Sequence, residues 1–331
     1  MNYVVFDLEW NQPMKPGDEE ACALPFEIIE VGAVLLNEDR QIIGEFSEIV
    51  KPNVYHRINI YTKEIVNLQM KELRKGKPFP EVMDRFMKFC GEDCIFCTWG
   101  PGDLVELQRN MKYYDLPPLS DGPFRYYDVQ KMFSLEFEGH KGARALDYAV
   151  DFLNIQKSEV FHRAYGDAYY TAKIFEKITS PEILEKFSYD TYHIPQKRNE
   201  EVYASFPGYS KYISRGFRDK TEAIHDREVI SSRCPVCNNR LKKCVRTFTP
   251  GGKYYLNVAV CEEHGYLKSK IRIKKTDEGT TYVVKTQRFV TEDEVAQIAG
   301  KRAHIHEVKR MKEELAKRKA GKSHQKKEEI E

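Results

Sequence analysis

The first half of the chain alternates apolar runs that have the period of a strand with segments that have the period of a helix. Strands are predicted over Tyr3–Phe6, Glu27–Leu36, Gln41–Val50 and Cys94–Thr98. Helices are predicted over Pro80–Cys90, Asp103–Tyr113, Ala143–Leu153 and Asp167–Lys177. Because strands that alternate with helices along a chain commonly join one sheet, the pattern predicts an α/β domain with a mixed sheet flanked by helices.

Charge is divided unevenly along the 331 residues. Residues 1–195 hold 22 Lys and Arg against 32 Asp and Glu, a net charge of −10, whereas residues 196–331 hold 31 against 19, a net charge of +12. An acidic front and a basic rear favour a metal-using domain followed by a region that binds a polyanion. Two differently charged, solvated surfaces are the alternative.

Composition divides the chain into successive stretches. A globular domain over 1–195 is followed by a basic linker with scattered aromatic residues over 196–228. Residues 229–290 hold Cys pairs and β-rich segments, which predict a small zinc-ribbon-like module. Residues 291–331 predict a basic tail that begins as a helix and frays into disorder near Gly321.

The sequence also indicates a compartment. No apolar run approaches the roughly 20 residues that cross a bilayer, and the amino terminus lacks a basic stretch followed by an apolar core. We therefore expect a cytoplasmic protein with no membrane partner. Its eight Cys are expected to be reduced. We therefore interpret them as metal ligands or small core residues in preference to disulfide partners.

Two carboxylates stand at the end of the first predicted strand. Asp7 and Glu9 are two residues apart, and the two-residue period of a strand places both on one face of the sheet. Like charges so close are costly unless a cation lies between them, and carboxylate oxygens without nearby His or Cys suit Mg²⁺ or Mn²⁺. Solvated acids at a strand end are the alternative interpretation.

Two further acids open predicted helices. Asp103 follows a predicted strand and begins the next helix, and Asp167 begins a later helix, five residues after His162. Each acid alone is explained as a helix cap or a first-turn residue, and a single His as a surface or core residue. Only the combination with the pair on the first strand points to a site.

The combination resembles the DEDD family of 3′–5′ exonucleases, in the branch whose last motif carries a His. The resemblance covers roughly residues 1–180. The contexts Thr98-Trp99-Gly100 and His162-Arg163-Ala164 are most similar to the subgroup of histone-messenger and small-RNA-trimming exonucleases and the KinA-pathway inhibitor of sporulation. That subgroup commonly has an acidic residue where this chain has Gly166, although Asp167 itself remains.

This resemblance implies an RNase H-like fold and a nuclease that releases nucleoside 5′-monophosphates from a free 3′ end. It implies that two Mg²⁺ or Mn²⁺ ions are held by Asp7, Glu9, Asp103 and Asp167. His162 would act as the general base, because imidazole accepts a proton near neutral pH.

A second group of metal-binding residue types lies in the rear. Cys234-x2-Cys237 is separated by 23 intervening residues from Cys261-x2-His264. Two such knuckles separated by a β-rich stretch predict one tetrahedral Cys3His zinc site, structural because all four positions are filled. Unrelated core cysteines are the alternative.

A third set of cysteines, Cys90-x3-Cys94-x2-Cys97, matches the spacing of radical-SAM iron–sulfur ligands. We reject that interpretation because nothing else in the sequence suggests a (β/α) barrel. These residues are predicted to be small buried hydrophobic side chains.

Aromatic and basic residues alternate in the predicted linker, which is typical of single-strand binding. The candidate substrate-binding residues are Tyr209, Lys211, Arg215, Phe217 and Arg218. The alternative is a linker whose aromatic residues pack on the exonuclease domain.

The sequence therefore predicts a metal-dependent 3′–5′ exonuclease that acts on single-stranded nucleic acid, with RNA 3′ ends favoured. A DNA-directed proofreading or repair exonuclease is one alternative, and a non-catalytic regulatory or nucleic-acid-binding protein on the same fold is another. If the rear does not hold substrate, the zinc module is better explained as a docking site for a ribosomal or regulatory protein.

Overall fold

The structure, a computed structural model, describes residues 1–15, 24–66, 68–139 and 142–328. The chain divides into two compact units, Met1–His193 and Ile194–Glu331, called unit 1 and unit 2 below. None of the helices in the described residues combines the length and the apolar composition that crossing a bilayer requires.

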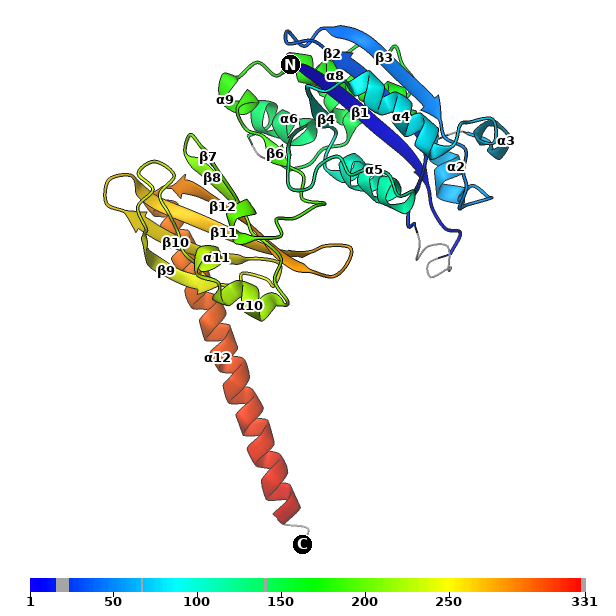
Figure 1. Ribbon diagram of the computed structural model, residues 1–331. Helices are drawn as coiled ribbons and strands as arrows, with labels where there is room; N and C mark the ends of the chain where they lie inside the picture. Colours follow the sequence, from blue (N-terminus) through cyan, green and yellow to red (C-terminus); the bar gives the residue numbers. More distant parts are fainter. Residues whose placement is uncertain (16–23, 67, 140–141, 329–331) are drawn as a thin grey trace. The chain divides into compact units, whose positions relative to one another are not determined.

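Unit 1 is built on a six-stranded sheet of order β3-β2-β1-β4-β5-β6 (Figure 1). Its strands are β1 (Asn2–Asn11), β2 (Glu27–Leu36), β3 (Ile42–Ile49), β4 (Cys94–Thr98), β5 (Arg125–Asp128) and β6 (Ser188–Tyr189). β1 pairs antiparallel with β2 and parallel with β4, and β4 pairs parallel with β5, so the sheet is mixed. The predicted α/β class with a mixed sheet is confirmed.

Helices cover both faces of this sheet. They are α2 (Ile60–Val66), α3 (Met70–Leu73), α4 (Phe79–Cys90), α5 (Gly102–Tyr113), α6 (Val129–Phe137), α7 (Leu146–Phe152), α8 (Ala164–Lys177) and α9 (Pro181–Leu184). One face packs on α4 and α5, where Val4 and Phe6 of β1 join a buried core. The other packs on α6, α7 and α8, where Val5 of β1 joins a second core. β1 is apolar on both sides because both faces are covered.

Unit 2 is built on a second six-stranded sheet, of order β7-β8-β12-β11-β10-β9, in which all neighbours are antiparallel. Its strands are β7 (Val202–Phe206), β8 (Tyr209–Ile213), β9 (Lys242–Phe248), β10 (Tyr255–Cys261), β11 (Gly265–Lys275) and β12 (Thr281–Val290). Its helices are η1 (Arg198–Glu200), α10 (Lys220–His225), α11 (Arg227–Ile230) and α12 (Glu292–Glu328).

The predicted linker over 196–228 differs from the structure, which places β7, β8 and α10 there. β8 pairs with β12 in the register Val284↔Ile213, so the segment continues the sheet of unit 2. Tyr212 and Phe217 are each 3% exposed and share a core with Ile271 of β11. β7 alternates between half-buried and exposed residues, whereas Tyr212 and Ile213 of β8 are both buried. The segment as a whole therefore lacks the regular alternation that marks a strand, and its composition resembles that of a solvated linker.

The predicted tail is helical over a longer range than expected. The hydroxyl of Thr291 accepts the backbone N–H of Glu294 at 3.3 Å, which caps the start of α12. Ile298 and Ile305 pack against the core of unit 2. The helix then runs past Gly321 to Glu328, since its residues are mostly strong helix formers. Residues 329–331 lie outside the described residues.

Candidate active site and metal-binding clusters

The alternation of β1 carries two acids onto the face that α8 covers. Val5 belongs to the core on that face, and the period of two places Asp7 and Glu9 on the same side. Asp167, in the first turn of α8, completes the group: the three carboxylates offer ligand atoms that all lie within 4.8 Å of one another. The structure therefore brings together three of the four acids that the sequence singled out.

Gly32 lets α8 approach the sheet closely enough to form this group. It lies opposite Asp7 in the β1–β2 ladder. A Cβ atom at this position would collide with the backbone of Ala164 and Tyr165 at the start of α8. The missing side chain thus seats the first turn of α8, with Asp167, above the ends of β1 and β2.

The fourth acid, Asp103, begins α5 after the end of β4 and is 6% exposed. Its carboxylate accepts the backbone N–H of Leu8 at 3.2 Å, and Leu8 is the residue between Asp7 and Glu9. Asp103 is therefore fastened beside the acid pair, in a position where it repels the carboxylate of Asp7.

His162 lies at the exposed edge of the acid cluster, just before α8. Its backbone N–H donates to Oδ1 of Asp167 at 3.3 Å. Its φ angle of 59° lies in the left-handed region, which a residue with a side chain seldom adopts. The turn that carries His162 is thus tied to the acid that begins the helix.

Gly166 supports the same turn. A Cβ atom at Gly166 would collide with the carbonyl oxygen of Val160, two residues before His162. Any side chain at this position would require a different path for the segment that holds His162.

If His162 is the general base that the sequence predicts, Gly166→Ala should lower turnover by about 100-fold, because a misplacement of a catalytic group by about 1 Å costs that much. The substitution removes none of the acids, so the Mn²⁺ concentration needed for half-maximal activity should change little. Gly122→Ala is the matched control, since a Cβ there meets nothing within 4 Å. Steady-state rates equal to wild type in Gly166→Ala would show that this turn does not position the base.

Glu30 and Arg163 belong to the site and were not among the predicted site residues. Glu30 lies opposite Glu9 in the β1–β2 ladder and is 1% exposed. Nε and Nη2 of Arg163 donate to its carboxylate at 3.0 and 2.6 Å. The pair fastens the residue after His162 to β2. An acid inside an otherwise apolar run, residues 28–36, was the sequence signal for such a partner.

Burial is the largest cause of a raised pKa at each acid of the cluster. It raises the pKa of Glu9 to about 8, of Asp103 to about 7 and of Asp167 to about 6. It also raises the pKa of Asp7 well above the ordinary value, with repulsion from Asp103 and Asp167 as the next causes. Such a cluster releases protons when a divalent cation binds.

We predict that the cation-free protein loses stability as the pH rises from about 5 to about 8. The folded state holds protons that the unfolded chain releases near pH 4, so the contribution is complete at low pH and is lost as the pH passes the folded pKa values of about 6 to 8. Mn²⁺ should raise the thermal midpoint more at about pH 8 than at about pH 5.5. Asp7→Asn should flatten this pH dependence in calorimetry; an equal slope in both proteins would contradict the prediction.

The chemistry of the acid cluster fits hard divalent cations. Carboxylate oxygens from Asp7, Glu9 and Asp167 converge, and no His or Cys ligand atom joins them among the described residues. All-oxygen donors are the set that Mg²⁺ and Mn²⁺ prefer.

The Cys and His residues of unit 2 form a second cluster. Ligand atoms of Cys234, Cys237, Cys261 and His264 all lie within 4.8 Å of one another. The Sγ atoms of Cys237 and Cys261 are 3.7 Å apart, and Sγ of Cys261 lies 3.5 Å from Nδ1 of His264. Bond lengths of about 2.3 Å for Zn–S and about 2.0–2.1 Å for Zn–N give tetrahedral edges of about 3.8 Å and about 3.5 Å. The spacing fits a tetrahedral zinc site.

The electrostatics of this cluster favour a thiolate at Cys261. At Cys237 the backbone N–H of Asn239 lowers the pKa, but burial and hydrogen bonds with Cys234 and Cys261 outweigh it, so that pKa is raised. The hydrogen bond with His264 is the largest cause that lowers the pKa of Cys261, to about 7, and backbone N–H groups of Glu263 and His264 lower it further. Thiolate is the form of Cys that binds metal.

The three cysteines of unit 1 are placed differently. Cys90 and Cys97 are buried in the two cores, and Cys94 is half-buried at the start of β4. They do not form a metal-binding group among the described residues. Their packing agrees with the predicted role as small hydrophobic side chains.

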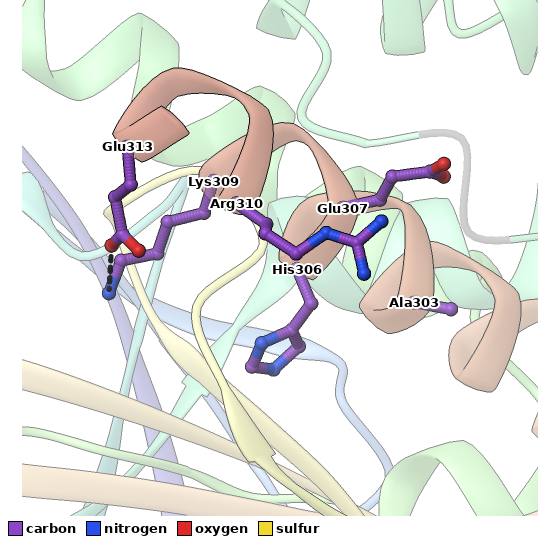
Figure 2. Close-up of a pocket in the computed structure, with 6 residues that line it drawn as sticks. All are labelled: Ala303, His306, Glu307, Lys309, Arg310 and Glu313. Atoms are coloured by element: carbon purple, nitrogen blue, oxygen red, sulfur yellow. Dashed lines mark ion pairs between the residues drawn. The ribbon is translucent and has the colours of Figure 1, made fainter. Parts of the chain in front are cut away.

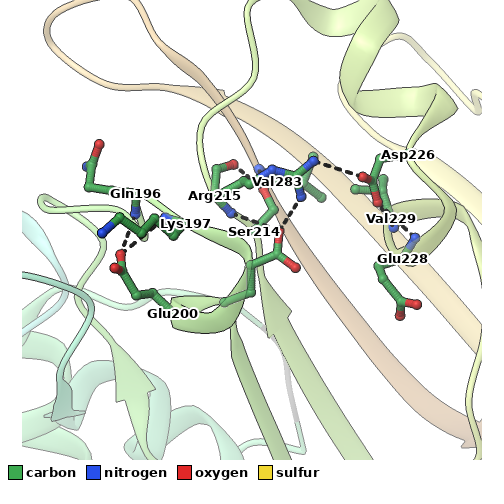
Figure 3. Close-up of polar contacts among 10 residues, drawn as sticks. Gln196, Lys197, Glu200, Ser214, Arg215, Asp226, Glu228, Val229 and Val283 are labelled. Carbon is green, nitrogen blue, oxygen red and sulfur yellow. Dashed lines mark hydrogen bonds and ion pairs between the residues drawn. The ribbon is translucent and has the colours of Figure 1, made fainter.

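The predicted substrate-binding residues are dispersed by the fold. Phe217 lies in the core of unit 2, so its ring has no exposed face for a base. Arg215 donates to Glu201 at 2.7 Å and to Asp226 at 3.2 Å, and therefore braces the unit (Figure 3). Tyr209 stacks on Phe206 across the β7–β8 hairpin. Arg218 remains largely exposed, with 83% of its side chain accessible.

Lys211 lies in the middle of β8, opposite Ala204 of β7 and Thr286 of β12, and its side chain is half-buried. Of the predicted set, only Arg218 therefore lies on an open, strongly exposed surface.

A hollow of about 550 Å³ lies along α12 (Figure 2). Its lining residues are Ala303, His306, Glu307, Lys309, Arg310 and Glu313. They come from one helix and carry charges of both signs, and Lys309 pairs with Glu313 at 3.9 Å. Ligand groups do not converge here, so this hollow carries no site.

With this geometry in view, the family is clear. The model of the exonuclease family matches residues 4–175, which include both strands and all the helices that build the acid cluster. The chain belongs to the exonuclease family.

Curated relatives agree with this assignment. A probable 3′–5′ exonuclease KapD of Bacillus subtilis is 24% identical over 165 residues, which are 48% of this chain and 77% of the relative. DNA polymerase III PolC-type of Streptococcus pneumoniae is 23% identical over 138 residues, 42% of this chain. The match spans only 9% of that polymerase.

Solved structures with a similar fold include the nuclease domain of 3′hExo bound to rAMP. It is 17% identical, with a TM-score of 0.47, and the match covers 57% of this chain and 96% of that one. An E. coli ExoI–ssDNA complex is 15% identical, with a TM-score of 0.44, over 56% of this chain and 42% of that one.

Proposed function

We propose that this protein is a metal-dependent 3′–5′ exonuclease that removes nucleoside 5′-monophosphates from the 3′ end of single-stranded nucleic acid. The observation that carries the proposal is the convergence of Asp7, Glu9 and Asp167, with His162 at the open edge of the group. A binding protein has no need for half-buried, mutually repelling acids, and at neutral pH a bound cation removes the cost that their raised pKa values reflect.

Two divalent cations, when bound, would activate a water molecule and stabilise the charge that develops on the phosphate and the leaving 3′ oxygen. Asp7, Glu9 and Asp167 would hold them, and Asp103 would hold the acid pair in place through the backbone of Leu8. His162 would accept the proton of the attacking water and pass it to solvent at the exposed edge.

In unit 2 we propose one structural Zn²⁺, held by Cys234, Cys237, Cys261 and His264. The tetrahedral spacing of the ligand atoms and the thiolate character of Cys261 support this ion. With all four positions filled by protein, such an ion joins the segment before β9 to the β10–β11 turn and takes no part in the hydrolysis.

We propose RNA as the preferred substrate, because the sequence around Thr98 and His162 is most similar to the RNA-trimming subgroup. DNA is the second candidate, and the match to a PolC-type DNA polymerase favours it. The shared chemistry of both is the phosphodiester bond at a 3′ end.

One experiment tests direction, sugar and strand preference together. The full chain is incubated with Mg²⁺ or Mn²⁺ and with matched 5′-labelled RNA and DNA, single- and double-stranded. We expect a ladder that shortens from the 3′ end, fastest for single-stranded RNA. A faster ladder on DNA would assign the second candidate, and intact substrates with both cations would exclude the exonuclease.

A further inference from the structure

Unit 2 holds a hollow of about 510 Å³ whose lining is strongly basic. Its cations are Arg218, Lys220, Lys253, Lys274 and Lys275. They come from three separate parts of the unit: the start of α10 with the segment before it, the β9–β10 turn and the end of β11. The fold therefore gathers positive charge that is scattered along the sequence.

Acidic residues neutralise only part of this charge. Asp219 is the acid among the described lining residues, and it is already engaged. Its carboxylate lies 3.4 Å from Nε of Arg218 and accepts the backbone N–H of Glu222 at 2.9 Å. In the part of the chain that the structure describes, Lys220, Lys253 and Lys275 have no carboxylate partner. The hollow thus keeps a net positive charge.

The lining also includes two tyrosines, which pack toward different cores of the unit. Tyr254 and Tyr255 are half-buried and line it. The ammonium of Lys220 lies 5.3 Å from the ring centre of Tyr255, and that of Lys270 lies 4.3 Å from the ring of Tyr254. A ring holds an ammonium group in position without cancelling its charge, so Lys220 stays available to an anion.

We propose that this hollow binds the phosphate backbone of a single-stranded nucleic acid, at a distance along the strand from the 3′ end that is being hydrolysed. Its volume and its three cationic segments exceed what a single phosphate needs, and they suit a chain of phosphates with bases near aromatic rings. The inference rests on the proposed exonuclease function, since it concerns the same substrate.

The proposal is tested by binding, separately from hydrolysis. The full chain carries Asp7→Asn to prevent turnover, and fluorescence anisotropy measures its affinity for a labelled single-stranded RNA of roughly 20 nucleotides. The pocket variant adds Lys253→Gln with Lys275→Gln. The control adds Lys242→Gln with Lys301→Gln, which removes the same charge from exposed positions of unit 2 outside the hollow.

We expect the pocket variant to bind about tenfold more weakly and the control less than twofold more weakly. The log–log slope of affinity against salt should fall by about 1.4 in the pocket variant, about 0.7 for each phosphate contact. Equal zinc content and equal thermal midpoints show that both variants are folded. Equal losses in both variants, or no loss in either, overturn the proposal.

The two proposals fail separately. If the parent chain without Asp7→Asn leaves RNA and DNA intact while the pocket variant still loses affinity, the exonuclease is excluded and the binding hollow stands. If hydrolysis proceeds and the pocket variant binds like the control, the hollow is excluded and the exonuclease stands.

Discussion

Asp7→Asn, Glu9→Gln and Asp167→Asn should each lower nuclease turnover by roughly 10³-fold or more while the protein stays folded. Each substitution keeps the size of the side chain and removes one charged ligand from a group whose atoms lie within 4.8 Å of one another. The metal-free variants should also be more stable than the parent near pH 8, because one buried repelling charge is gone. His162→Ala should cost roughly 10²–10⁴ in rate.

Exposed acids of unit 1 provide the controls. Glu64→Gln and Asp121→Asn remove the same kind of charge at the surface and should leave turnover within about twofold of the parent. The measurement is the rate at saturating Mn²⁺ on the preferred oligonucleotide, with thermal unfolding as the check on folding. Parental turnover in Asp7→Asn would contradict the assignment of this cluster as the catalytic centre.

Cys234→Ser combined with Cys261→Ser should remove one zinc per chain and unfold the part of unit 2 that the cluster joins. Zinc in comparable knuckles contributes roughly 10–16 kcal/mol of apparent binding free energy near neutral pH, more than the stability of a small domain. Because the acid cluster lies in unit 1, hydrolysis of a short oligonucleotide should persist in this variant. Elemental analysis and the far-ultraviolet circular dichroism of the full chain measure the two effects.

Cys244→Ser is the matched control, since Cys244 is exposed and lies outside the cluster. It should retain the full zinc content and the parental unfolding midpoint. Zinc retained by the double variant, or no zinc in the parent chain, would refute this site.

The sequence predicted most of the elements of unit 1 because their patterns are local. The two-residue period of β1 and the helical period of α4 can be recognised within each segment, without knowing which other element it packs against. The prediction for residues 196–228 differs from the structure because β8 acquires its buried face only by pairing with β12, more than 60 residues later. The short run Tyr-Ser-Lys-Tyr-Ile of β8 has no local feature that separates it from a solvated linker.

The acids of the cluster could also be predicted from the sequence. The residues that hold the cluster in place could not. Residue type and spacing, taken together with the acids and the histidine farther along the chain, make Asp7 and Glu9 candidate ligands. The left-handed backbone of His162 is a property of the turn that carries it. In the sequence, Glu30 has no feature that assigns it a role. Its role follows from the register of β1 and β2, which places it opposite Glu9, and from its ion pair with Arg163. Such roles depend on contacts between residues far apart in the sequence, and a short stretch of sequence does not contain this information.

The close approach at Gly32 has a consequence for judging which chains of this fold are active. The ladder sets the residues of one strand against those of the other, Asp7 against Gly32 and Glu9 against Glu30. A relative that retained every acid and the histidine but carried a side chain at position 32 would hold α8 away from the strands, and its carboxylates would no longer share a cation. Such a chain would contain every motif residue but would lack the activity. Gly32, which has no reactive side chain, therefore distinguishes a chain that can be active from one that cannot. Deciding which chains of this fold are active requires inspecting β2 as closely as β1.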